Sequence, residues 1–448
     1  MRAIVQHPAG CAVLLALAVI VAGRPAWAQG MAVQLDGTVN VGATQTTRSI
    51  FVPDPMPEKS DVKDSSVNTL YTELRPAISL QFGSPRVSWR LGYLLSGNLS
   101  LAGEQALAYS NQLTGSMIAE LTKLTTLTVN GSAAQGGTSF LLTQTPADAG
   151  TPQIRAPGNP NLISATLGES IASALGRQLS LQHSLIGSLS APQDALGKAN
   201  TSLAASLSLE RLFNRDTAGL EVRAGISWLS PLAAGTSRYT TSTSSLLARW
   251  NHDFTPSWNA LVLAGVEEVF TDTGSKPLAL LPTGTATVRY TGGSIVGSLE
   301  ASHGTTTNLQ VGSVSLADRV TARGVVTIDP IKLRVLSFSA GVLHNQPLGE
   351  VAADVAAGTG DAVQGDVAFG TEISRNVQGT VRYSVAYQFG QDSGLGATLA
   401  HIFLIGVTAS YNNTSRVLRP IPTRGVRVDG SDAKGFPVVD EPPVDPKP

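Results

Sequence analysis

The stretch LYTELRPAISLQFGSPRVSWRLGYLL, residues 70–95, contains two segments in which apolar and polar side chains alternate. In the first segment the even-numbered positions up to Phe82 are mostly apolar, whereas the odd-numbered positions include Glu73 and Arg75. A Gly-Ser-Pro sequence follows, and the alternation then resumes from Val87. Because successive side chains of a strand point to opposite faces, this period predicts two antiparallel strands joined by a tight turn.

The same alternation recurs over residues 31–411, in pieces of roughly 9 to 14 residues. Short connections such as 83–85 alternate along the chain with longer ones rich in Gly, Pro and Asp, such as 44–67 and 137–162. An up-and-down barrel that crosses an outer membrane has this order, with short turns on the periplasmic side and long loops outside. The pattern therefore predicts an all-β, transmembrane, antiparallel barrel rather than a soluble sandwich.

The number of strands depends on two regions. Residues 285–302 are too long for one strand, and Gly292-Gly293 can form a two-residue hairpin turn that divides them. Residues 161–175 are the least regular region, because Glu169 falls on an otherwise apolar face. Counting both gives about 18 strands with both ends in the periplasm, and 16 is the alternative.

The composition limits the class of protein. Charged residues make up 14% of the chain, against about 25% in soluble domains, and the net charge of −1 favours no nucleic-acid partner. The single cysteine, Cys11, excludes a disulfide framework and a thiolate site in the rest of the chain. No HExxH or GxSxG motif is present, so we expect no enzyme, cofactor or metal. The histidines past residue 100 are scattered, at His183, His252, His303, His344 and His401.

The two ends of the chain differ from its middle. Residues 1–28 contain an apolar run and end in Ala26-Trp27-Ala28, which predicts a cleaved signal peptide. Residues 29–411 form the predicted barrel. Residues 412–448 lack the alternation and end in DEPPVDPKP, which predicts a flexible, Pro-rich periplasmic tail that could contact a periplasmic partner.

Together with two groups of aromatic residues near the predicted strand ends, these features resemble the bacterial outer-membrane porin class. The resemblance covers the architecture of residues 31–411 and no narrower family. The last strand, within LAHIFLIGVTASY (399–411), resembles the signal read by the barrel-assembly machinery, with Gly406, Ala409 and the terminal aromatic Tyr411 at its characteristic positions. The resemblance implies the outer membrane of a Gram-negative cell, its lipids and that machinery as partners.

A barrel of this size leaves an aqueous lumen, so function should depend on inward-facing polar residues and on the loops. The third external loop, 137–162, is our candidate for a constriction by resemblance to porins, with Phe140 and Arg155 as its notable residues. The residues predicted to line the lumen and set ion preference are Glu73, Arg75, Arg90, Glu221, Arg223, Arg249, Arg289, Arg319, Arg323, Asp366, Glu372 and Arg382.

Three functions fit this architecture. The first is a porin-like channel that passes hydrophilic solutes. The second is an export conduit for a polysaccharide in an exopolysaccharide-secretion system, and the third is an adhesin or structural barrel that acts through its external loops. The oligomeric state stays open, with a homo-oligomer among the alternatives.

Overall fold

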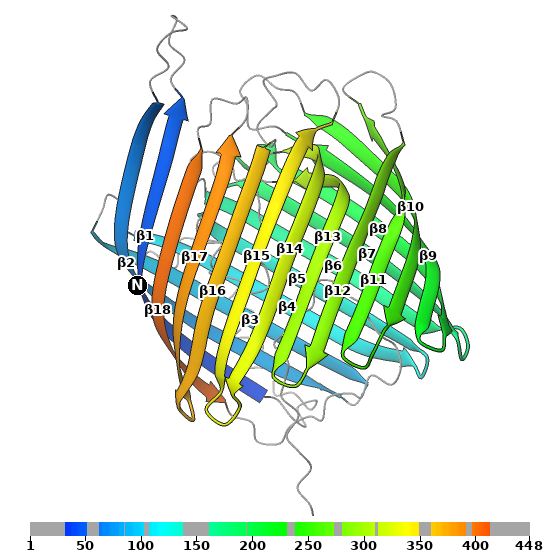
Figure 1. The fold of residues 1–448 in the computed structure, drawn as a ribbon, viewed down its shortest axis with the longest axis horizontal. Helices are drawn as coiled ribbons and strands as arrows, with labels where there is room; N and C mark the ends of the chain where they lie inside the picture. The colour runs from blue at the N-terminus through cyan, green and yellow to red at the C-terminus, as the bar shows by residue number, and fades with distance from the viewer. Residues whose placement is uncertain are drawn as a thin grey trace, which may run out of the picture.

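The computed structural model describes residues 32–51, 62–84, 86–102, 107–137, 161–193, 195–230, 238–272, 280–309, 312–348, 360–390 and 397–412. These residues form one sheet of 18 antiparallel strands that closes into a barrel (Figure 1). The predicted signal peptide and Pro-rich tail lie outside the described residues. The strands are β1 (Ala32–Phe51), β2 (Val62–Ser84), β3 (Val87–Ala102), β4 (Leu107–Thr122), β5 (Thr125–Gly137), β6 (Asn161–Ala174), β7 (Leu179–Pro192), β8 (Asn200–Phe213), β9 (Asp216–Leu229), β10 (Tyr239–Asp253), β11 (Trp258–Thr271), β12 (Leu281–Gly292), β13 (Ile295–Asn308), β14 (Ser313–Asp329), β15 (Arg334–Pro347), β16 (Gly360–Ser374), β17 (Val377–Gly390) and β18 (Thr398–Asn412).

Each strand pairs with its neighbours in the sequence, and the first strand closes the barrel by pairing with the last. In that closing pair Leu35 lies opposite Tyr411, and Ala43 lies opposite Phe403. Closure leaves no sheet edge with unpaired backbone groups, which is what a strand protein needs inside a membrane. The predicted fold class, an up-and-down antiparallel barrel, is confirmed.

The strand count of 18 is confirmed as well, and both uncertain regions form strands. β12 ends at Gly292 and β13 begins at Ile295. Gly293 between them has a φ of 53°, a left-handed conformation that favours glycine. Residues 161–174 pair with β5 and β7 along their whole length, so Glu169 does not prevent strand formation.

The prediction of a loop over residues 44–67 was too wide. β1 continues to Phe51 and β2 begins at Val62, and these two residues lie opposite each other. The polar residues on either side of the loop weaken the apolar alternation, but their backbones still pair as a hairpin. Figure 1 shows this β1–β2 hairpin standing beyond the rim at the upper left. Amphipathic alternation detects only the part of a strand that faces lipid, so it missed this extension.

The outer and inner walls of the barrel have opposite character. Large apolar side chains on one parity of each strand are exposed on the outside, for example Val39 at 48%, Leu74 at 54% and Val222 at 52%. The other parity carries charged, hydroxyl and amide side chains, several of them buried, such as Glu73, Glu221 and Asp366. Within the described ranges, no helix has the length and apolarity that a membrane crossing requires.

Candidate functional site

The inner wall is the candidate functional site, because alternation brings the charged residues of many strands to it. All the residues that we predicted to line the lumen lie on the parity opposite to the exposed apolar side chains. Glu221 and Arg223, for example, flank the outward-facing Val222 on β9. The structure gathers these residues into separate clusters rather than into one ring.

The first cluster lies on β1, β2 and β3, and we call it the seam cluster: Asn40, Glu73, Arg75 and Ser96. The Glu73 carboxylate accepts hydrogen bonds from Asn40 Nδ2 at 2.8 Å and from Ser96 Oγ at 2.7 Å. Arg75 Nε lies 3.7 Å from the same carboxylate. The Glu73 side chain is almost fully buried, so these contacts replace the water that a carboxylate would otherwise bind.

Two glycines allow close packing beside the seam cluster. At Gly42 of β1, a Cβ would lie 2.7 Å from the Tyr71 ring and 2.6 Å from Leu404 of β18. At Gly406 of β18, a Cβ would lie 1.9 Å from Asn40 Oδ1. Tyr71 and Leu404 therefore both lie over Gly42, and Asn40 lies over Gly406, so side chains of β18 and β1 reach across the joint between the first and last strands.

The second cluster joins β8, β9 and β10, and it alternates in charge. Arg249 Nε lies 2.9 Å from Glu210, and Arg249 Nη1 lies 3.5 Å from Glu221. Arg223 Nε lies 2.6 Å from the other oxygen of Glu221. Arg249 and Glu221 are largely buried in this network, whereas the Arg223 side chain is 45% exposed to the lumen. Arg223 is thus the member of this cluster that a passing solute would meet.

A third cluster lies on β16 and β17. Arg382 Nε lies 2.5 Å from Asp366, and Ser384 Oγ donates to the same carboxylate oxygen at 2.6 Å. Opposite charges on neighbouring strands thus pair along the wall, and their fields largely cancel at a distance.

Of the predicted lumen residues outside these clusters, Arg90 lies on β3 and Glu372 on β16, and three arginines lie on β12 and β14. Arg289 is on β12, and Arg319 and Arg323 are on β14, with Glu300 of β13 within electrostatic reach of Arg319. A recess of about 150 Å³ in this wall is lined by Arg223 and Arg319 and by the hydroxyl side chains of Thr283, Thr285, Ser302, Thr305 and Thr306, among others. This sector therefore offers several donors to a solute.

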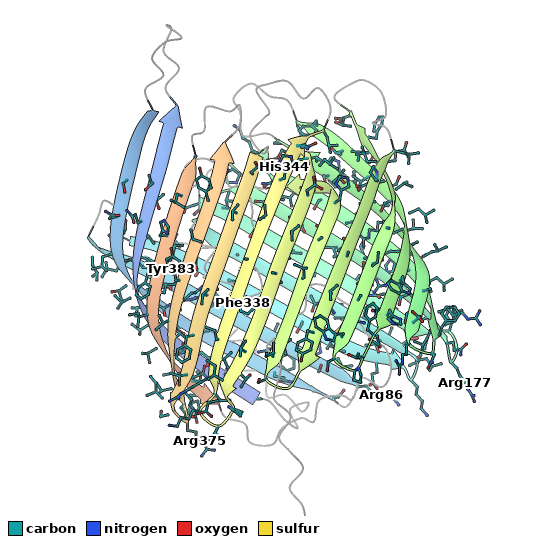
Figure 2. All side chains as sticks on the ribbon, in the orientation of Figure 1. Arg86, Arg177, Phe338, His344, Arg375 and Tyr383 are labelled. Carbon is teal, nitrogen blue, oxygen red and sulfur yellow. The ribbon has the colours of Figure 1, made fainter. Side chains whose placement is uncertain are left out.

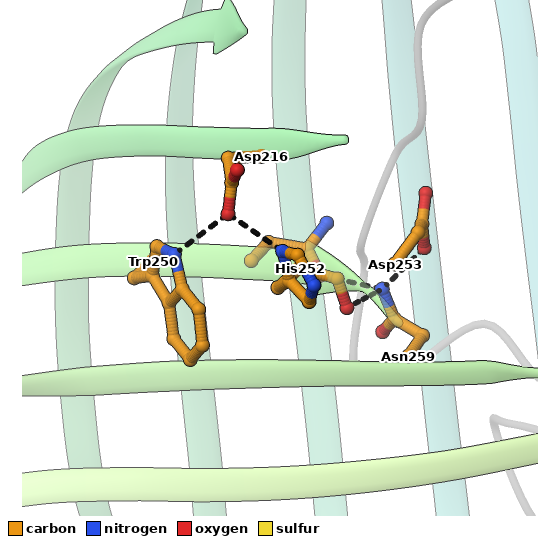
Figure 3. Close-up of polar contacts among 6 residues, drawn as sticks. Asp216, Trp250, His252, Asp253 and Asn259 are labelled. Carbon is orange, nitrogen blue, oxygen red and sulfur yellow. Dashed lines mark hydrogen bonds and ion pairs between the residues drawn. The ribbon is translucent and has the colours of Figure 1, made fainter. Parts of the chain in front are cut away.

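Aromatic and ionic residues form a belt on the outer wall at the end with the short turns. Trp250 Nε1 donates to Asp216 at 3.0 Å, and His252 Nδ1 lies 2.7 Å from the same carboxylate oxygen (Figure 3). The rings of Trp258 and Tyr290 lie 4.8 Å apart. Rings with a polar edge prefer the interface between lipid and water, so this end of the barrel marks one membrane surface.

Charged turns lie beyond this belt. Figure 2 shows Arg86, Arg177 and Arg375 at the lower rim, beside the short turns, whereas His344 lies near the upper rim. The outer wall between the two rims is covered by apolar side chains, among which Phe338 is labelled. The apolar band is therefore bounded on both sides by polar residues.

Two further predictions concern the last strand and the third external loop. Gly406, Ala409 and Tyr411 lie in β18, where Ala409 pairs with Gly37 and Tyr411 faces outward near the strand end. Their role in barrel assembly stays a prediction. Phe140 and Arg155, the candidate constriction residues, lie outside the described residues.

Sequence analysis missed the neutral partners of the charged residues. Asn40, Ser96 and Ser384 complete the clusters around Glu73 and Asp366, and Gly42 and Gly406 provide the space. Their inward parity was visible in the sequence, but the register between strands that pairs them was not. Among the described residues, no three His, Cys, Asp or Glu side chains gather as a metal site requires.

An 18-stranded closed barrel with an apolar outer wall and a charged inner wall is the architecture of the outer-membrane porin class, as the sequence predicted. No family model and no curated protein sequence matches the chain. Solved structures with a similar barrel include OccK9 (OpdG) of Pseudomonas aeruginosa, at 13% identity and a TM-score of 0.41, covering 86% of this chain and 100% of that one.

Two further similar structures are OccK2 (OpdF) of Pseudomonas aeruginosa in complex with glucuronate and a BenF-like porin from Pseudomonas fluorescens. The first has 12% identity and a TM-score of 0.40, covering 84% of this chain and 98% of its own. The second has 11% identity and a TM-score of 0.38, covering 84% and 99%. At such identities and scores these likenesses carry no inference about the solute.

Proposed function

We propose that this protein is a porin-like channel in the outer membrane of a Gram-negative cell, passing small hydrophilic solutes through its lumen. The observation that carries the proposal is the opposite character of the two walls within single strands. On β9, Val222 faces lipid while Arg223 is exposed on the inside. An apolar outer wall needs lipid around it, and exposed guanidinium groups inside need water.

The pairing of charges supports a channel with weak ion selectivity. Arg249 is held between Glu210 and Glu221, and Arg382 is held by Asp366, so neither arginine presents an isolated charge to the lumen. Paired charges set a local transverse field without a strong preference for ions of one sign. A hydrophilic solute would meet hydroxyl groups and the exposed Arg223.

The polysaccharide-export hypothesis gains no support from the inner wall. A track of exposed aromatic faces would favour passage of sugar chains, but Tyr71, the clearest inward-facing ring in the sequence, is only 8% exposed. Its ring lies over Gly42 instead. The hydrophilic-solute channel therefore fits the lumen better.

The proposal is tested by conductance in planar lipid bilayers with two matched cysteine variants. The background is the chain without residues 1–28, the predicted signal peptide, which contains the only native cysteine, Cys11. In Arg223→Cys the thiol faces the lumen, and in Val222→Cys it faces lipid one residue away. We expect a charged, water-soluble thiol reagent to reduce the current through Arg223→Cys and to leave Val222→Cys unchanged.

Two outcomes would contradict the proposal. A refolded barrel that passes no current at any voltage is not a passive channel. Equal sensitivity of the two variants to the reagent would show that the current does not pass through the lumen that Arg223 lines. For a conducting barrel, the size above which neutral polymers no longer enter the pore and lower its conductance gives the width of the solute path.

A further inference from the structure

An ionisable pair lies on the outer wall, away from both membrane surfaces. Glu169 of β6 and His183 of β7 lie on the lipid-facing parity, with Glu169 Oε1 and His183 Nδ1 4.0 Å apart. Each side chain is 41% exposed, so neither is covered by the barrel itself. This pair includes the glutamate that interrupts the apolar face of residues 161–175 in the sequence.

The depth of the pair follows from the strand ends. β7 begins at Leu179, which lies opposite Arg211, and the Arg211 guanidinium lies over the Phe213 ring at the periplasmic belt. His183 is four residues further along β7, and Glu169 is five residues before the end of β6 at Ala174. A tilted strand crosses the apolar layer in about 9–11 residues, so both side chains lie near mid-depth.

Such a position is costly for a barrel surrounded only by lipid. Charged side chains on the lipid face destabilise barrels most at the middle of the bilayer. The other pairs of a histidine with a carboxylate on the described outer wall lie nearer the rims. His252 lies beside Asp216 at the belt, and His303 with Asp318 lies on the strands next to His344 with Asp361, towards the upper rim. An ionisable group in the middle of a membrane face therefore indicates a polar partner there.

The outer surface around Leu167, two residues before Glu169 on β6, has the shape of a packing interface. Gly131, Leu167, Gly187 and Leu203 lie opposite one another in one row across β5 to β8, so small and large side chains alternate. Leu167 is 64% exposed and forms a ridge, and Gly187 leaves a gap beside it. Small residues let two membrane-embedded surfaces approach closely, as at helix interfaces.

We infer that the β6–β7 wall is the docking face for a second copy of this chain. The two residues lie side by side on neighbouring strands, so a two-fold axis along the membrane normal places His183 of each copy opposite Glu169 of the partner subunit. The same axis brings the Leu167 ridge of one copy to the Gly187 gap of the partner subunit. A self-complementary patch of this kind is what a symmetric dimer requires. The inference depends on insertion into the membrane but not on the solute.

Cross-linking in lipid vesicles tests the location of the interface. On the cysteine-free background without residues 1–28, Leu167→Cys places a thiol on the proposed face, and Leu299→Cys places one on β13, in another sector of the outer wall, where the leucine is 52% exposed. A short bis-maleimide reagent should cross-link Leu167→Cys into dimers and leave Leu299→Cys monomeric. Equal cross-linking of both variants, or none at residue 167, would overturn the inference.

The role of the pair is tested by dimerisation measured on dilution in lipid, with energy transfer between labelled copies. The double variant Glu169→Leu/His183→Leu makes the face more apolar, so folding is preserved and can be checked by the mobility of the unheated barrel in gels. We expect the dissociation constant to rise about tenfold or more, since each tenfold step corresponds to about 1.4 kcal/mol. The control is Asp216→Leu/His252→Leu, which removes an outward pair at the belt and should leave the constant unchanged.

A wild-type chain that stays monomeric at every protein density would overturn the inference, as would a dimer that the double variant does not weaken. Conductance per barrel separates this inference from the proposed function. An active channel that never dimerises refutes the docking face alone, whereas a dimer that passes no current refutes the channel alone.

Discussion

Replacing Glu73 by alanine should destabilise the barrel more than any change to an exposed lumen charge. The Glu73 carboxylate is 2% exposed and accepts from Asn40 Nδ2 and Ser96 Oγ, which are buried as well. Without it, both donors lose their acceptor and Arg75 loses a carboxylate 3.7 Å from its Nε. Each unsatisfied buried polar group costs about 1–3 kcal/mol.

The net loss should be smaller than the sum of these terms. Removing the carboxylate also removes the cost of burying it, and lumen water can reach part of the space. Breaking a buried charged network by deleting one partner typically costs about 3–5 kcal/mol, so we expect a loss of about 3 kcal/mol here. Glu73→Gln keeps one acceptor oxygen and should lose about half as much.

The assay is equilibrium unfolding by guanidinium chloride in phospholipid vesicles, followed by the fluorescence of Trp89, Trp228, Trp250 and Trp258 in the barrel. Arg90→Ala is the control, because Arg90 is exposed to the lumen and its hydrogen bond to Ser79 Oγ is long, at 3.5 Å. The control should change stability by less than about 1 kcal/mol. If Glu73→Ala unfolds at the same denaturant concentration as the control, the seam cluster does not stabilise the barrel and our reasoning is wrong.

Three other predictions follow from the walls and the last strand. Glu221→Gln removes a carboxylate between two arginines and should raise the anion-to-cation permeability ratio about fivefold, since loss of a unit negative charge at about 8 Å in water favours an anion and disfavours a cation by about 0.5 kcal/mol each; an unchanged reversal potential in a salt gradient would contradict this. Gly406→Ala should cost about 1–3 kcal/mol in the same unfolding assay because its Cβ displaces Asn40, whereas Gly37→Ala, which has open space, should not destabilise. Deletion of residues 413–448 should leave folding and heat-modifiable mobility intact, because β18 ends at Asn412, and a barrel that no longer assembles would refute an inert tail.

The fold could be predicted because a strand between lipid and a water-filled lumen must alternate apolar and polar side chains. Val222 between Glu221 and Arg223 shows this alternation: one residue faces lipid, and its two neighbours face water. The turn predicted at Gly292-Gly293 forms one residue later, at Gly293 and Ser294, and it could be predicted because the first residue of such a two-residue turn needs a positive φ that glycine adopts easily. The β1–β2 extension was missed because a strand outside the membrane does not need an apolar face.

The lumen clusters could be predicted only in part. Parity indicated that Glu73 and Arg382 face inward, but it could not indicate which residues on neighbouring strands they meet. That depends on register, and Asn40 reaches Glu73 because the two residues lie opposite each other between β1 and β2. Register is set by turns and by the whole closed sheet, so a pattern within one strand does not contain it.

The joint between β1 and β18 also has a consequence for the order in which the barrel forms. All the other pairs of neighbouring strands are joined by a turn or a loop. β1 and β18, in which Leu35 lies opposite Tyr411, are instead separated by nearly the whole sequence of the barrel. The entropic cost of bringing two segments together grows with their separation in the chain, so we expect this joint to form last. The packing of Tyr71 over Gly42 and of Asn40 over Gly406 then stabilises the last pair of strands to form. Substitutions there should slow completion of the barrel even where transport through the finished one is normal.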